Sequence, residues 1–527
     1  MYAREPSQPD NGKGHSVTQI KKGTVNTLEE IKQPTKGVLT PLPTVEELRA
    51  ALSASEQSST RRLVAALFDE GTFSELGVYT MRKFSEDGSG ASSLSPDGVI
   101  CGYGAVDGRL VFVFAQDDTR TDGAMDERHA SKIVSLYEMA LKNGAPVVGV
   151  FNSKGADLYE GVSALAAYGR VMKKVAEASG RIPQIAIVAG CCTGSAALIA
   201  SMFDFTVTVQ GSPFYVHDSE GGEGNLLAST FIAKDGKAAA RDARVLLAYL
   251  PSSASDGVLQ ATPADSINRS LGKVDFAGDL SRLLRALTDN GVMQEITRDF
   301  SPEMLTAFAF LGGVRCGVLG NRFVGEGRTM DAAAARKAAR FVSFCDAFSL
   351  PIVTFVDASG FSDCDARGVG TYASDLASLA FAYAGAEVPK ITVILGRAIG
   401  GAFTVLGSKA MGADVVFALE DAEISALPSD AAVAFAWNDR VMLDPEAAIE
   451  NAEDLEDTRT VPPISTNREE LEDAWRRSLA SPAPAACRGE VDDIITVDEM
   501  RRRILSSLYM LSGKGVLGAR RHPILPL

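Results

Sequence analysis

Two stretches of this 527-residue chain match each other position by position. Residues 181–196 read RIPQIAIVAGCCTGSA, and residues 387–402 read EVPKITVILGRAIGGA. In both, a proline leads into an apolar run, which is typical of a strand buried on both faces of a parallel sheet. Both then end in glycine and small residues, where a helix is predicted to begin. The match indicates that one strand-turn-helix unit occurs twice in the chain.

The repeat extends outward from these stretches. GAPVVGVF (144–151) aligns with SLPIVTFV (349–356), and each predicts a strand that precedes the first match. Helices are predicted at residues 129–143, 162–179, 195–202, 341–348, 371–384 and 402–409, and further strands at 205–209 and 414–418. Each half opens with a predicted hairpin, one turning at Asp107-Gly108 and the other at Gly312-Gly313. The sequence therefore predicts an α/β fold built as a tandem duplication.

Three segments follow from this pattern. Residues 1–44 are polar and weakly periodic, which indicates an N-terminal extension that is flexible or bound to a partner. Residues 45–300 and 301–527 are the two predicted domains, with a mixed helix at 279–299 as their connection. An Arg-rich amphipathic helix is predicted at 496–511.

Composition excludes several classes of protein. The net charge of −15 opposes nucleic-acid binding. The uncharged run 182–203 is long enough to cross a membrane, but its glycines and polar residues favour a buried strand followed by a buried helix, and we expect no membrane insertion. The N-terminus has no apolar run of a secretory leader. Seven cysteines without a CxxC pair predict neither a disulfide framework nor a zinc site, and they fit a reducing cytoplasm.

Chemistry is most strongly indicated where the two matched strands end. At each corner three small residues begin a helix: Gly194, Ser195 and Ala196 in the first half, and Gly400, Gly401 and Ala402 in the second. The first N–H groups of a helix have no partner within it and favour a negative oxygen, and glycine lets a carbonyl approach closely. Such donors form oxyanion holes in acyl transfer. A single corner of this kind would more often be a packing feature, but two at equivalent positions favour function.

Side chains for acid-base or nucleophilic catalysis are scarce. Of the four histidines, none lies in a catalytic or metal-binding motif, and His129 is interpreted as a surface or helix-capping residue. Cys191 and Cys192 adjoin the first corner without a histidine partner and are interpreted as small buried residues. No metal site is predicted. If the chain is an enzyme, backbone donors must carry much of the catalysis.

Several segments together resemble one protein family. They are LFDEGTFSEL (67–76), GVICGYGAVDGR (98–109), VFAQD (113–117), AARFVSFCDAFSLPIVT (338–354), GGAF (400–403) and GEVDDII (489–495). The chain resembles, over about residues 50–527, the acyl-CoA carboxyltransferases: the β subunits of propionyl-CoA and acetyl-CoA carboxylases and the α subunits of methylmalonyl-CoA and glutaconyl-CoA decarboxylases.

The resemblance implies a crotonase-like spiral fold in each half and a carboxyl transfer between carboxybiotin and the α-carbon of an acyl-CoA. The two corners would be oxyanion holes, one for the thioester enolate and the other for the biotin ureido oxygen, and which serves which stays open. Because no Met-Lys-Met biotinylation site occurs, biotin would be carried on a separate biotin carboxyl carrier or biotin carboxylase subunit. The resemblance also implies dimers in which the first half of one copy faces the second half of another, in a homo-oligomer such as a hexamer.

Some positions differ from the family pattern. The CoA-binding loop, Gly-Gly-Ala-Arg in the family, reads Lys-Gly-Ala-Asp here at 154–157, so that Gly155 and Ala156 remain as predicted substrate-binding residues. Phe403 and Thr404 are the predicted acyl-pocket residues, with Thr404 in place of the family's Asp. Two alternatives stay open: a non-catalytic paralogue that assembles with an active carboxyltransferase subunit, and a crotonase-type hydratase or isomerase.

Overall fold

The computed structural model of the chain describes residues 44–53, 58–80, 97–217, 229–256, 262–263, 265–272, 274, 279–322, 328–362, 370–438 and 467–514. The predicted extension at 1–44 lies outside these residues except for Thr44. By its contacts the chain divides after Val45, and everything below concerns Glu46–Leu527.

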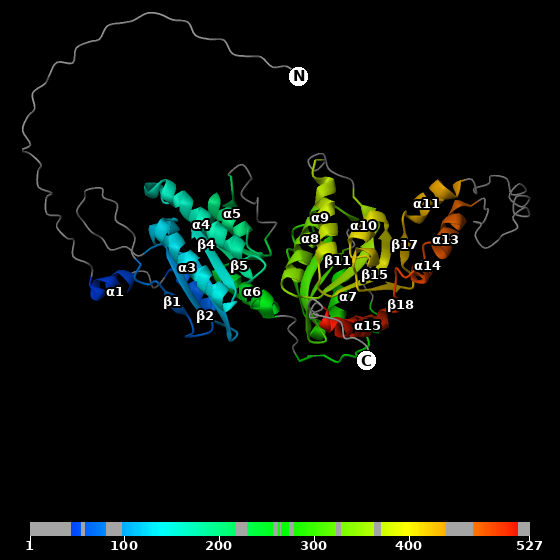
Figure 1. Cartoon of the computed structure of the whole chain (residues 1–527), viewed down its shortest axis with the longest axis horizontal. Coiled ribbons are helices and arrows are strands. Elements are labelled where there is room, and N and C mark those ends of the chain that lie inside the picture. The colour runs from blue at the N-terminus through cyan, green and yellow to red at the C-terminus, as the bar shows by residue number, and fades with distance from the viewer. Residues whose placement is uncertain are drawn as a thin grey trace, which may run out of the picture. The chain divides into compact units, whose positions relative to one another are not determined.

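The first half is a mixed sheet in the order β1-β2-β3-β4-β5-β6-β8, with β7 paired to the end of β5 (Figure 1). Its strands are β1 (Ser74–Leu76), β2 (Val99–Val106), β3 (Arg109–Gln116), β4 (Val147–Ser153), β5 (Gln184–Thr193), β6 (Phe205–Val209), β7 (Phe214–Tyr215) and β8 (Phe231–Ala233). Its helices are α2 (Ser59–Leu67), α3 (Glu127–Asn143), α4 (Val162–Ala178), α5 (Ser195–Ser201) and α6 (Gly236–Tyr249), with the short 3-10 turns η1 (Thr121–Gly123), η2 (Leu158–Glu160) and η4 (Ala254–Asp256); α1 (Val45–Ser53) precedes them. β1 to β3 pair antiparallel and the later strands pair parallel.

The second half repeats this order as β9-β10-β11-β13-β15-β16-β18, with β17 paired to the end of β15. Its strands are β9 (Met293–Ile296), β10 (Met304–Leu311), β11 (Val314–Asn321), β13 (Ile352–Ala358), β15 (Lys390–Ile399), β16 (Val415–Leu419), β17 (Glu423–Ser425) and β18 (Asp493–Ile495), and β12 (Thr329–Met330) pairs with β14 (Gly360–Phe361) alongside. Its helices are α7 (Leu280–Leu287), α8 (Ala332–Ala347), α9 (Tyr372–Gly385), α10 (Gly400–Val405), α11 (Ser429–Ala436), α13 (Arg468–Ser478), α14 (Pro482–Cys487) and α15 (Val497–Met510), with η5 (Asp289–Gly291), η6 (Lys409–Met411) and η8 (Leu511–Gly513).

The two halves correspond beyond the matched sequence. β4 and β13 each shift register near their carboxyl end, between Phe151 and Ser153 in one and between Val356 and Ala358 in the other. Both predicted hairpins form, β2–β3 around Asp107 and Gly108 and β10–β11 around Gly312 and Gly313. The α/β duplication predicted from the sequence is therefore confirmed.

Residues 280–296 pack with or pair to the second sheet. The sequence assigns them to the connection at the end of the first domain, yet β9 pairs antiparallel with β10, and the leucines of α7 share an apolar cluster with β10, β11 and α15. α7 and β9 correspond to α2 and β1, which open the first half. We therefore place the start of the second half before Leu280 instead of at residue 301.

Two helices differ in length from prediction for local reasons. α8 begins at Ala332 instead of residue 341, because Asp331 accepts a hydrogen bond from the Ala334 amide and the run of alanines that follows favours a helix. α10 ends at Val405 instead of residue 409, because Leu406 leaves helical geometry and Gly407 takes a positive φ of 73°.

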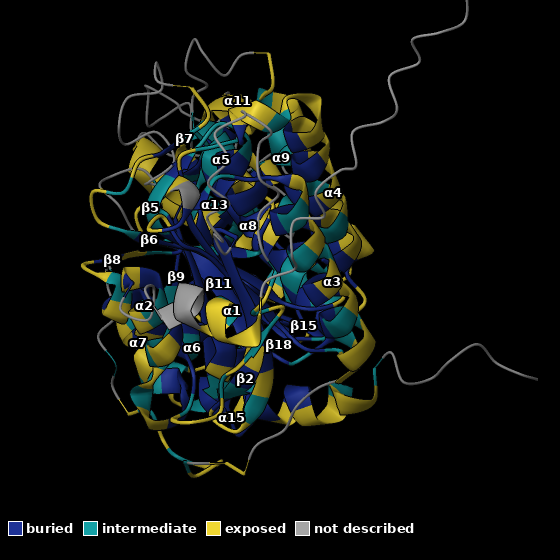
Figure 2. Ribbon diagram, turned by 90° about the vertical axis from the view of Figure 1, so that its left-hand side faces the viewer, coloured by how far each residue is buried: buried dark blue, intermediate teal, exposed yellow. Residues whose placement is uncertain are grey.

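Buried residues concentrate on the strands and on the inner faces of the helices (Figure 2). One apolar cluster contains residues of both halves, and in it Phe205 packs edge-on against Phe344 with ring centroids 4.8 Å apart. The predicted C-terminal helix is confirmed as α15, with a capping box between Thr496 and Glu499. Its Arg501 is fully buried and pairs with Asp289 at 2.7 Å, so this arginine joins α15 to the loop before β9.

The uncharged run 182–203 forms β5 and α5, as predicted. Among the described helices, none has both the length and the apolar character that crossing a bilayer requires.

Candidate active site

Two glycines make the sharp turns between strand and helix. Gly194 follows β5 and precedes α5, with φ 57° and ψ −126°. Gly400 follows β15 and begins α10, with φ 59°. A positive φ of this kind is costly for a residue with a Cβ, so both positions favour glycine. The predicted glycines therefore lie at equivalent turns with nearly equal φ.

The first corner has open space beside Gly194 and begins a helix with amide donors. The Gly194 amide donates to the Tyr215 carbonyl at 3.1 Å, which joins the turn to β7. The Leu198 amide donates back to the Gly194 carbonyl at 3.2 Å. The amides of Ser195 and Ala196 come before it, in the first turn, where helix donors have no partner in the helix. A Cβ built on Gly194 would meet no atom within 4 Å, so a substrate carbonyl has room to approach.

The second corner is more crowded. A Cβ built on Gly400 would lie 3.2 Å from the Ala426 carbonyl oxygen, and one on Gly401 would lie 2.9 Å from the Phe361 ring. Gly401 itself is exposed, and Ala402 is fully buried like its counterpart in the first half. A Cβ at Gly401 would therefore require the Phe361 ring to shift.

A polar residue at the end of β4 or β13 lies directly behind each corner. Asn152 is the second-last residue of β4, and its side chain contacts Gly190 so closely that a Cβ there would lie 2.0 Å from Oδ1. Asp357 occupies the equivalent position in the second half, where a Cβ on Gly396 would lie 2.8 Å from the carboxylate. These contacts require glycine in both strands and fix the path of the backbone into each turn.

The two polar residues differ in charge. Asp357 is 3% exposed, accepts hydrogen bonds from the Arg397 amide at 2.7 Å and the Arg328 guanidinium at 3.1 Å, and has a pKa raised by burial. Arg397 is also 3.6 Å from Glu423 of β17. The first half has Cys191 where the second has Arg397. The second corner therefore carries the guanidinium groups of Arg328 and Arg397, and the second of these stands where the first half has a cysteine.

The predicted CoA loop begins beside the first corner. Ser153 of β4 is in register with Cys192 of β5, so the loop leaves the sheet next to the residues that lead to Gly194. Gly155 has φ 123° and donates to the Ser153 hydroxyl at 3.1 Å, and Ala156 forms a bridge with Met125. The structure thus brings Gly155 and Ala156 to the same edge as the first corner.

The charged positions of this loop have local partners. Lys154 pairs with Asp122 at 2.8 Å on the surface. Asp157 is buried, and its carboxylate accepts the Tyr159 amide at 3.0 Å, where it caps η2. The acid that stands in place of the family's arginine therefore has a structural role.

Phe403 and Thr404 follow the second corner on α10. Phe403 is half-buried against the core cluster. Thr404 is exposed, and its hydroxyl donates to the Gly400 carbonyl at 3.2 Å. Thr404 therefore lies one helical turn after the corner.

The interpretation of His129 as a surface or capping residue is wrong. Its side chain is fully buried, and the cap of α3 is Asp126, which accepts the His129 amide at 2.7 Å. Burial lowers the pKa of the imidazole to about 3, with the Lys132 charge adding to the effect, so the ring is neutral at ordinary pH. Its Nε2 lies 3.5 Å from the Gln116 amide nitrogen.

Cys192 is fully buried, and burial raises the pKa of its thiol, which disfavours a thiolate nucleophile. Among the described residues, no three His, Cys, Asp or Glu side chains are grouped so that they could hold a metal ion.

The sequence reasoning missed Asn152, Asp357 and Arg328. A signal for the first two was present, since a polar residue directly follows the matched apolar run in each half. Arg328 had no such signal, because β12 brings it to Asp357 from a segment outside the matched repeat.

Comparisons with known proteins identify relatives over nearly the whole chain. The carboxyl transferase domain matches residues 57–218 and 228–525. The chain is 32% identical over 508 residues to the methylmalonyl-CoA decarboxylase subunit alpha of Propionigenium modestum, covering 90% of this chain and 94% of that one. It is 33% identical over 526 residues to the propionyl-CoA carboxylase beta chain of Saccharopolyspora erythraea, covering 92% and 93%.

A solved structure is similar in fold and sequence. The crystal structure of transcarboxylase 12S, described as a hexamer with methylmalonyl-coenzyme A and methylmalonic acid bound, matches with a TM-score of 0.78 and 28% identity. The match covers 92% of this chain and 95% of that one.

Proposed function

The chain belongs to the carboxyl transferase family, and we propose that it is the carboxyltransferase subunit of a biotin-dependent acyl-CoA carboxylase or decarboxylase. It would move a carboxyl group between carboxybiotin and the α-carbon of an acyl-CoA. The observation that carries the proposal is the pair of equivalent glycine turns, each at the carboxyl end of a parallel strand and each followed by a helix start.

The corners match the demands of this reaction. Transfer to an α-carbon passes through a thioester enolate, and release of the carboxyl group from biotin leaves charge on the ureido oxygen. Each oxygen needs donors positioned in advance, and one such donor contributes roughly 3 kcal/mol in acyl transfer. Amides of Ser195 and Ala196 would serve one oxygen, and amides of Gly401 and Ala402 the other. Neither step requires a histidine, in agreement with the buried, neutral His129.

We expect Gly155 and Ala156, in the loop beside the first corner, to contact the CoA, and Phe403 and Thr404, which follow the second corner, to contact the acyl group. Carboxybiotin supplies the carboxyl group and would be delivered by a separate carrier protein. Because biotin approaches on such a carrier, at least one corner must be open, as the space beside Gly194 is.

Exposed apolar side chains support assembly into a dimer-based homo-oligomer, with a hexamer as the expected form. In the first half Leu158, Tyr159 and Val162 are 88%, 91% and 79% exposed, where η2 leads into α4. In the second half Phe381 of α9, the counterpart of α4, is 83% exposed. Side chains of this size favour a covered surface, and their places suit pairing of one copy's first half with another's second half. A monomer at micromolar concentration in light scattering would contradict this.

We also propose a cytoplasmic location. All of the cysteines that the structure describes are free thiols, as is usual in a reducing compartment.

The test is direct transfer of a labelled carboxyl group. The purified chain is mixed with carboxyl-labelled methylmalonyl-CoA and a biotinylated carrier protein, and label on the carrier is measured. We expect label to appear with the biotinylated carrier and not with the same carrier lacking biotin. A folded chain that labels neither carrier with methylmalonyl-CoA or malonyl-CoA would contradict the proposal.

A second candidate is a non-catalytic subunit that assembles with an active relative. It is motivated by the loop at 154–157, whose charged residues pair locally with Asp122 and cap η2. In that case the chain alone would be inactive, and it would raise the transfer rate or stability of an active subunit when the two are co-expressed.

A further inference from the structure

The strand that leads into the first corner leaves its regular pairing just before the turn. Phe151 of β4 pairs with Val188 of β5. Two residues further along β4, Ser153 pairs with Cys192, which is four residues further along β5. Three residues of β5 therefore lie opposite Asn152 alone, in an enlarged β-bulge. Bulges bend a strand and are frequent beside active sites, where they change the direction in which the chain continues.

The Asn152 side chain fills this bulge. Gly190 is the middle residue of the bulged segment, and a Cβ on it would lie 2.0 Å from the Asn152 Oδ1. Asn152 is 8% exposed, so protein atoms surround it on nearly every side. The path of β5 into the turn therefore depends on where Asn152 is held.

Gln116 holds the Asn152 backbone from the other side. The regular pairing of β3 with β4 ends at Ala115 and Val150. Beyond that point the Gln116 side chain replaces the strand, and its Oε1 accepts the Asn152 amide at 3.3 Å. Gln116 is 1% exposed, and its Nε2 lies 3.5 Å from Nε2 of the buried His129. The glutamine is thus enclosed and can fix Asn152 in turn.

The second half holds the equivalent bulge in a different way. Asn321 ends β11 as Gln116 ends β3, but its side chain is one methylene shorter. Its Oδ1 is buried and, among the described residues, has no hydrogen-bond partner. Asp357, the residue in this bulge, is fixed by its own carboxylate, which accepts the Arg397 amide at 2.7 Å and the Arg328 guanidinium at 3.1 Å. The first corner therefore depends on a neighbouring side chain that the second corner does not use.

We propose that Gln116 is a positioning residue for the first oxyanion corner and acts through Asn152. The inference rests on the proposed carboxyl transfer. Without the Gln116 hydrogen bond Asn152 is free to shift, and the amides of Ser195 and Ala196 shift with the bulged strand. A displacement of about 1 Å at a catalytic group can lower a rate about 10²-fold, so a residue that touches no substrate still affects turnover.

Three substitutions of Gln116 test the hydrogen bond. Gln116→Met keeps the length of the side chain and removes the acceptor. We expect it to lower kcat for carboxyl transfer at least about tenfold and to change KM for the acyl-CoA less than about twofold, because oxyanion donors act on the transition state more than on the bound substrate. Gln116→Glu keeps an oxygen at this place and should restore most of the rate. Gln116→Asn copies the shorter side chain of Asn321, should behave like Gln116→Met, and replaces it in the test if Gln116→Met does not fold.

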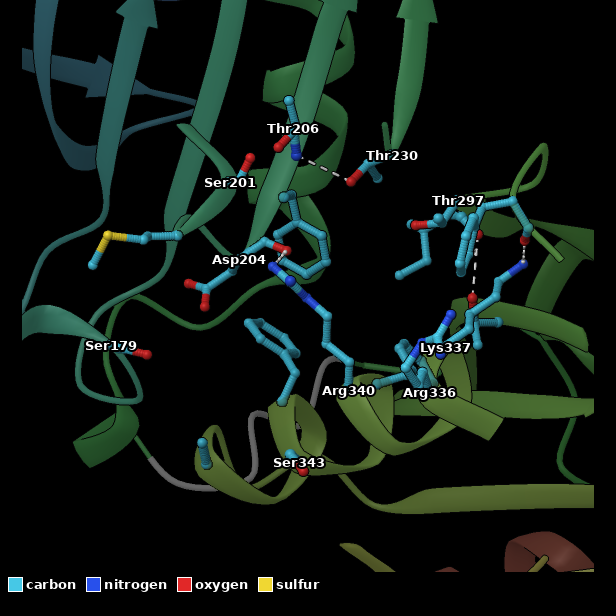
Figure 3. Close-up of a pocket in the computed structure, with 18 of the residues that line it drawn as sticks. Ser179, Ser201, Asp204, Thr206, Thr230, Thr297, Arg336, Lys337, Arg340 and Ser343 are labelled. Carbon is cyan, nitrogen blue, oxygen red and sulfur yellow. Dashed lines mark hydrogen bonds between the residues drawn. The ribbon is translucent and has the colours of Figure 1, made fainter. Parts of the chain in front are cut away.

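Two controls separate positioning from loss of stability. Gln184→Met removes a fully buried glutamine at the start of β5, where Oε1 accepts the Tyr137 hydroxyl at 2.9 Å and Nε2 donates to the Val175 carbonyl at 3.1 Å. That end of β5 is opposite to the corner and adjoins Asp204, which lines the cavity shown in Figure 3. Asn321→Leu removes the unpaired oxygen in the second half. Both controls should keep most of the transfer rate, whatever change they make to the thermal midpoint.

Hydrogen exchange across residues 188–198 is followed on the same proteins and needs no activity. We expect Gln116→Met to speed exchange of this segment and neither control to do so. An unmodified chain that transfers no carboxyl group contradicts the proposed function, and unchanged exchange in a folded Gln116→Met then overturns the inference separately. If the unmodified chain is active, unchanged kcat in a folded Gln116→Met overturns it. An equal loss of kcat in either control, or no recovery of rate in a folded Gln116→Glu, overturns it as well.

Discussion

The two glycine corners share a backbone and differ in their surroundings. Gly194 and Gly400 have φ values of 57° and 59°, and each turn follows a strand held against a polar residue at the end of its neighbour. Around Gly194 there is open space, whereas Gly401 faces the Phe361 ring. The repeat therefore kept the donors in place while the side chains around them diverged, as expected if the corners serve different oxygens of one reaction.

A second difference lies at the helix that precedes β4 or β13. Asp126 caps α3 through the His129 amide, and Asp331 caps α8 through the Ala334 amide, so His129 and Ala334 are counterparts. Both are fully buried. The first half thus buries a titratable ring where the second buries a methyl group, and acid should destabilise the two halves unequally.

The largest expected effect is at the open corner. Gly194→Val places a side chain in the space that a substrate carbonyl would use, and the turnover number should fall by about 10²–10³, the loss associated with one disrupted oxyanion donor. Some loss of stability is also expected, since a positive φ strains a β-branched residue by roughly 1–3 kcal/mol. Transfer rate and thermal midpoint are measured on the same protein.

Gly161→Val is the matched control for strain. Gly161 has φ 53° and ψ −122°, almost the angles of Gly194, and a Cβ there would also meet no atom within 4 Å. We expect it to lower the midpoint similarly while keeping most of the transfer rate. Equal loss of rate in both folded variants would assign the effect to strain and not to an oxyanion hole.

The next prediction concerns how the free energy of unfolding depends on pH, which the buried His129 of the first half should determine. The folded state keeps His129 neutral, with a pKa near 3, while the unfolded chain takes up a proton below about pH 6.5. Protons therefore favour unfolding in this window, and stability that is present above pH 6.5 is lost as the pH falls toward 3. At roughly pH 4.5 the loss should reach about 3 kcal/mol.

His129→Gln removes this titration. Its free energy of unfolding should fall less steeply than that of the unmodified chain between pH 6.5 and 4.5, measured by denaturant unfolding at each pH. His217→Gln, at an exposed histidine, should follow the unmodified curve. Parallel curves for all three proteins would show that burial of His129 does not set the acid response.

Much of the fold could be predicted because the matched apolar runs mark buried parallel strands directly. The short β1 and β9 could not, since a strand of three or four residues has too little periodicity to recognise. The sequence predicts α7 as a helix but not that it belongs to the second half. That depends on how its leucines pack against β10, β11 and α15, which the sequence pattern does not reveal.

Some features of the candidate site could be predicted from the sequence, and others could not. The glycine turns could be predicted, because a positive φ restricts the residue type. The burial of His129 was not, because it depends on how α3 packs on the sheet near Gln116. The contact between Phe361 and Gly401 could not be predicted either, since β14 is brought to Gly401 by pairing with β12.

A third prediction tests the crowding at the second corner. Gly401→Ala should lower the free energy of unfolding by about 1–3 kcal/mol, because its Cβ would lie 2.9 Å from the Phe361 ring. In the double variant with Phe361→Leu the cost of Gly401→Ala should shrink by at least about 1 kcal/mol. The cost of Gly194→Ala should not change with Phe361→Leu. Additive effects at Gly401 and Phe361 would contradict the contact.

The smallest effect concerns which acyl group the second corner accepts. Thr404 is exposed one turn after Gly400, and its hydroxyl is held on the Gly400 carbonyl, so a longer acidic side chain there would extend toward a group bound at the corner. Thr404→Asp should shift the ratios of kcat/KM among acetyl-, propionyl- and a longer or polar acyl-CoA by about tenfold, since one pocket contact contributes roughly 1–3 kcal/mol. Thr404→Asn has a similar shape without the charge, so a shift seen with Asp alone is electrostatic and one seen with both is steric. Unchanged ratios in both variants would remove Thr404 from the acyl pocket and leave the second corner to the biotin oxygen.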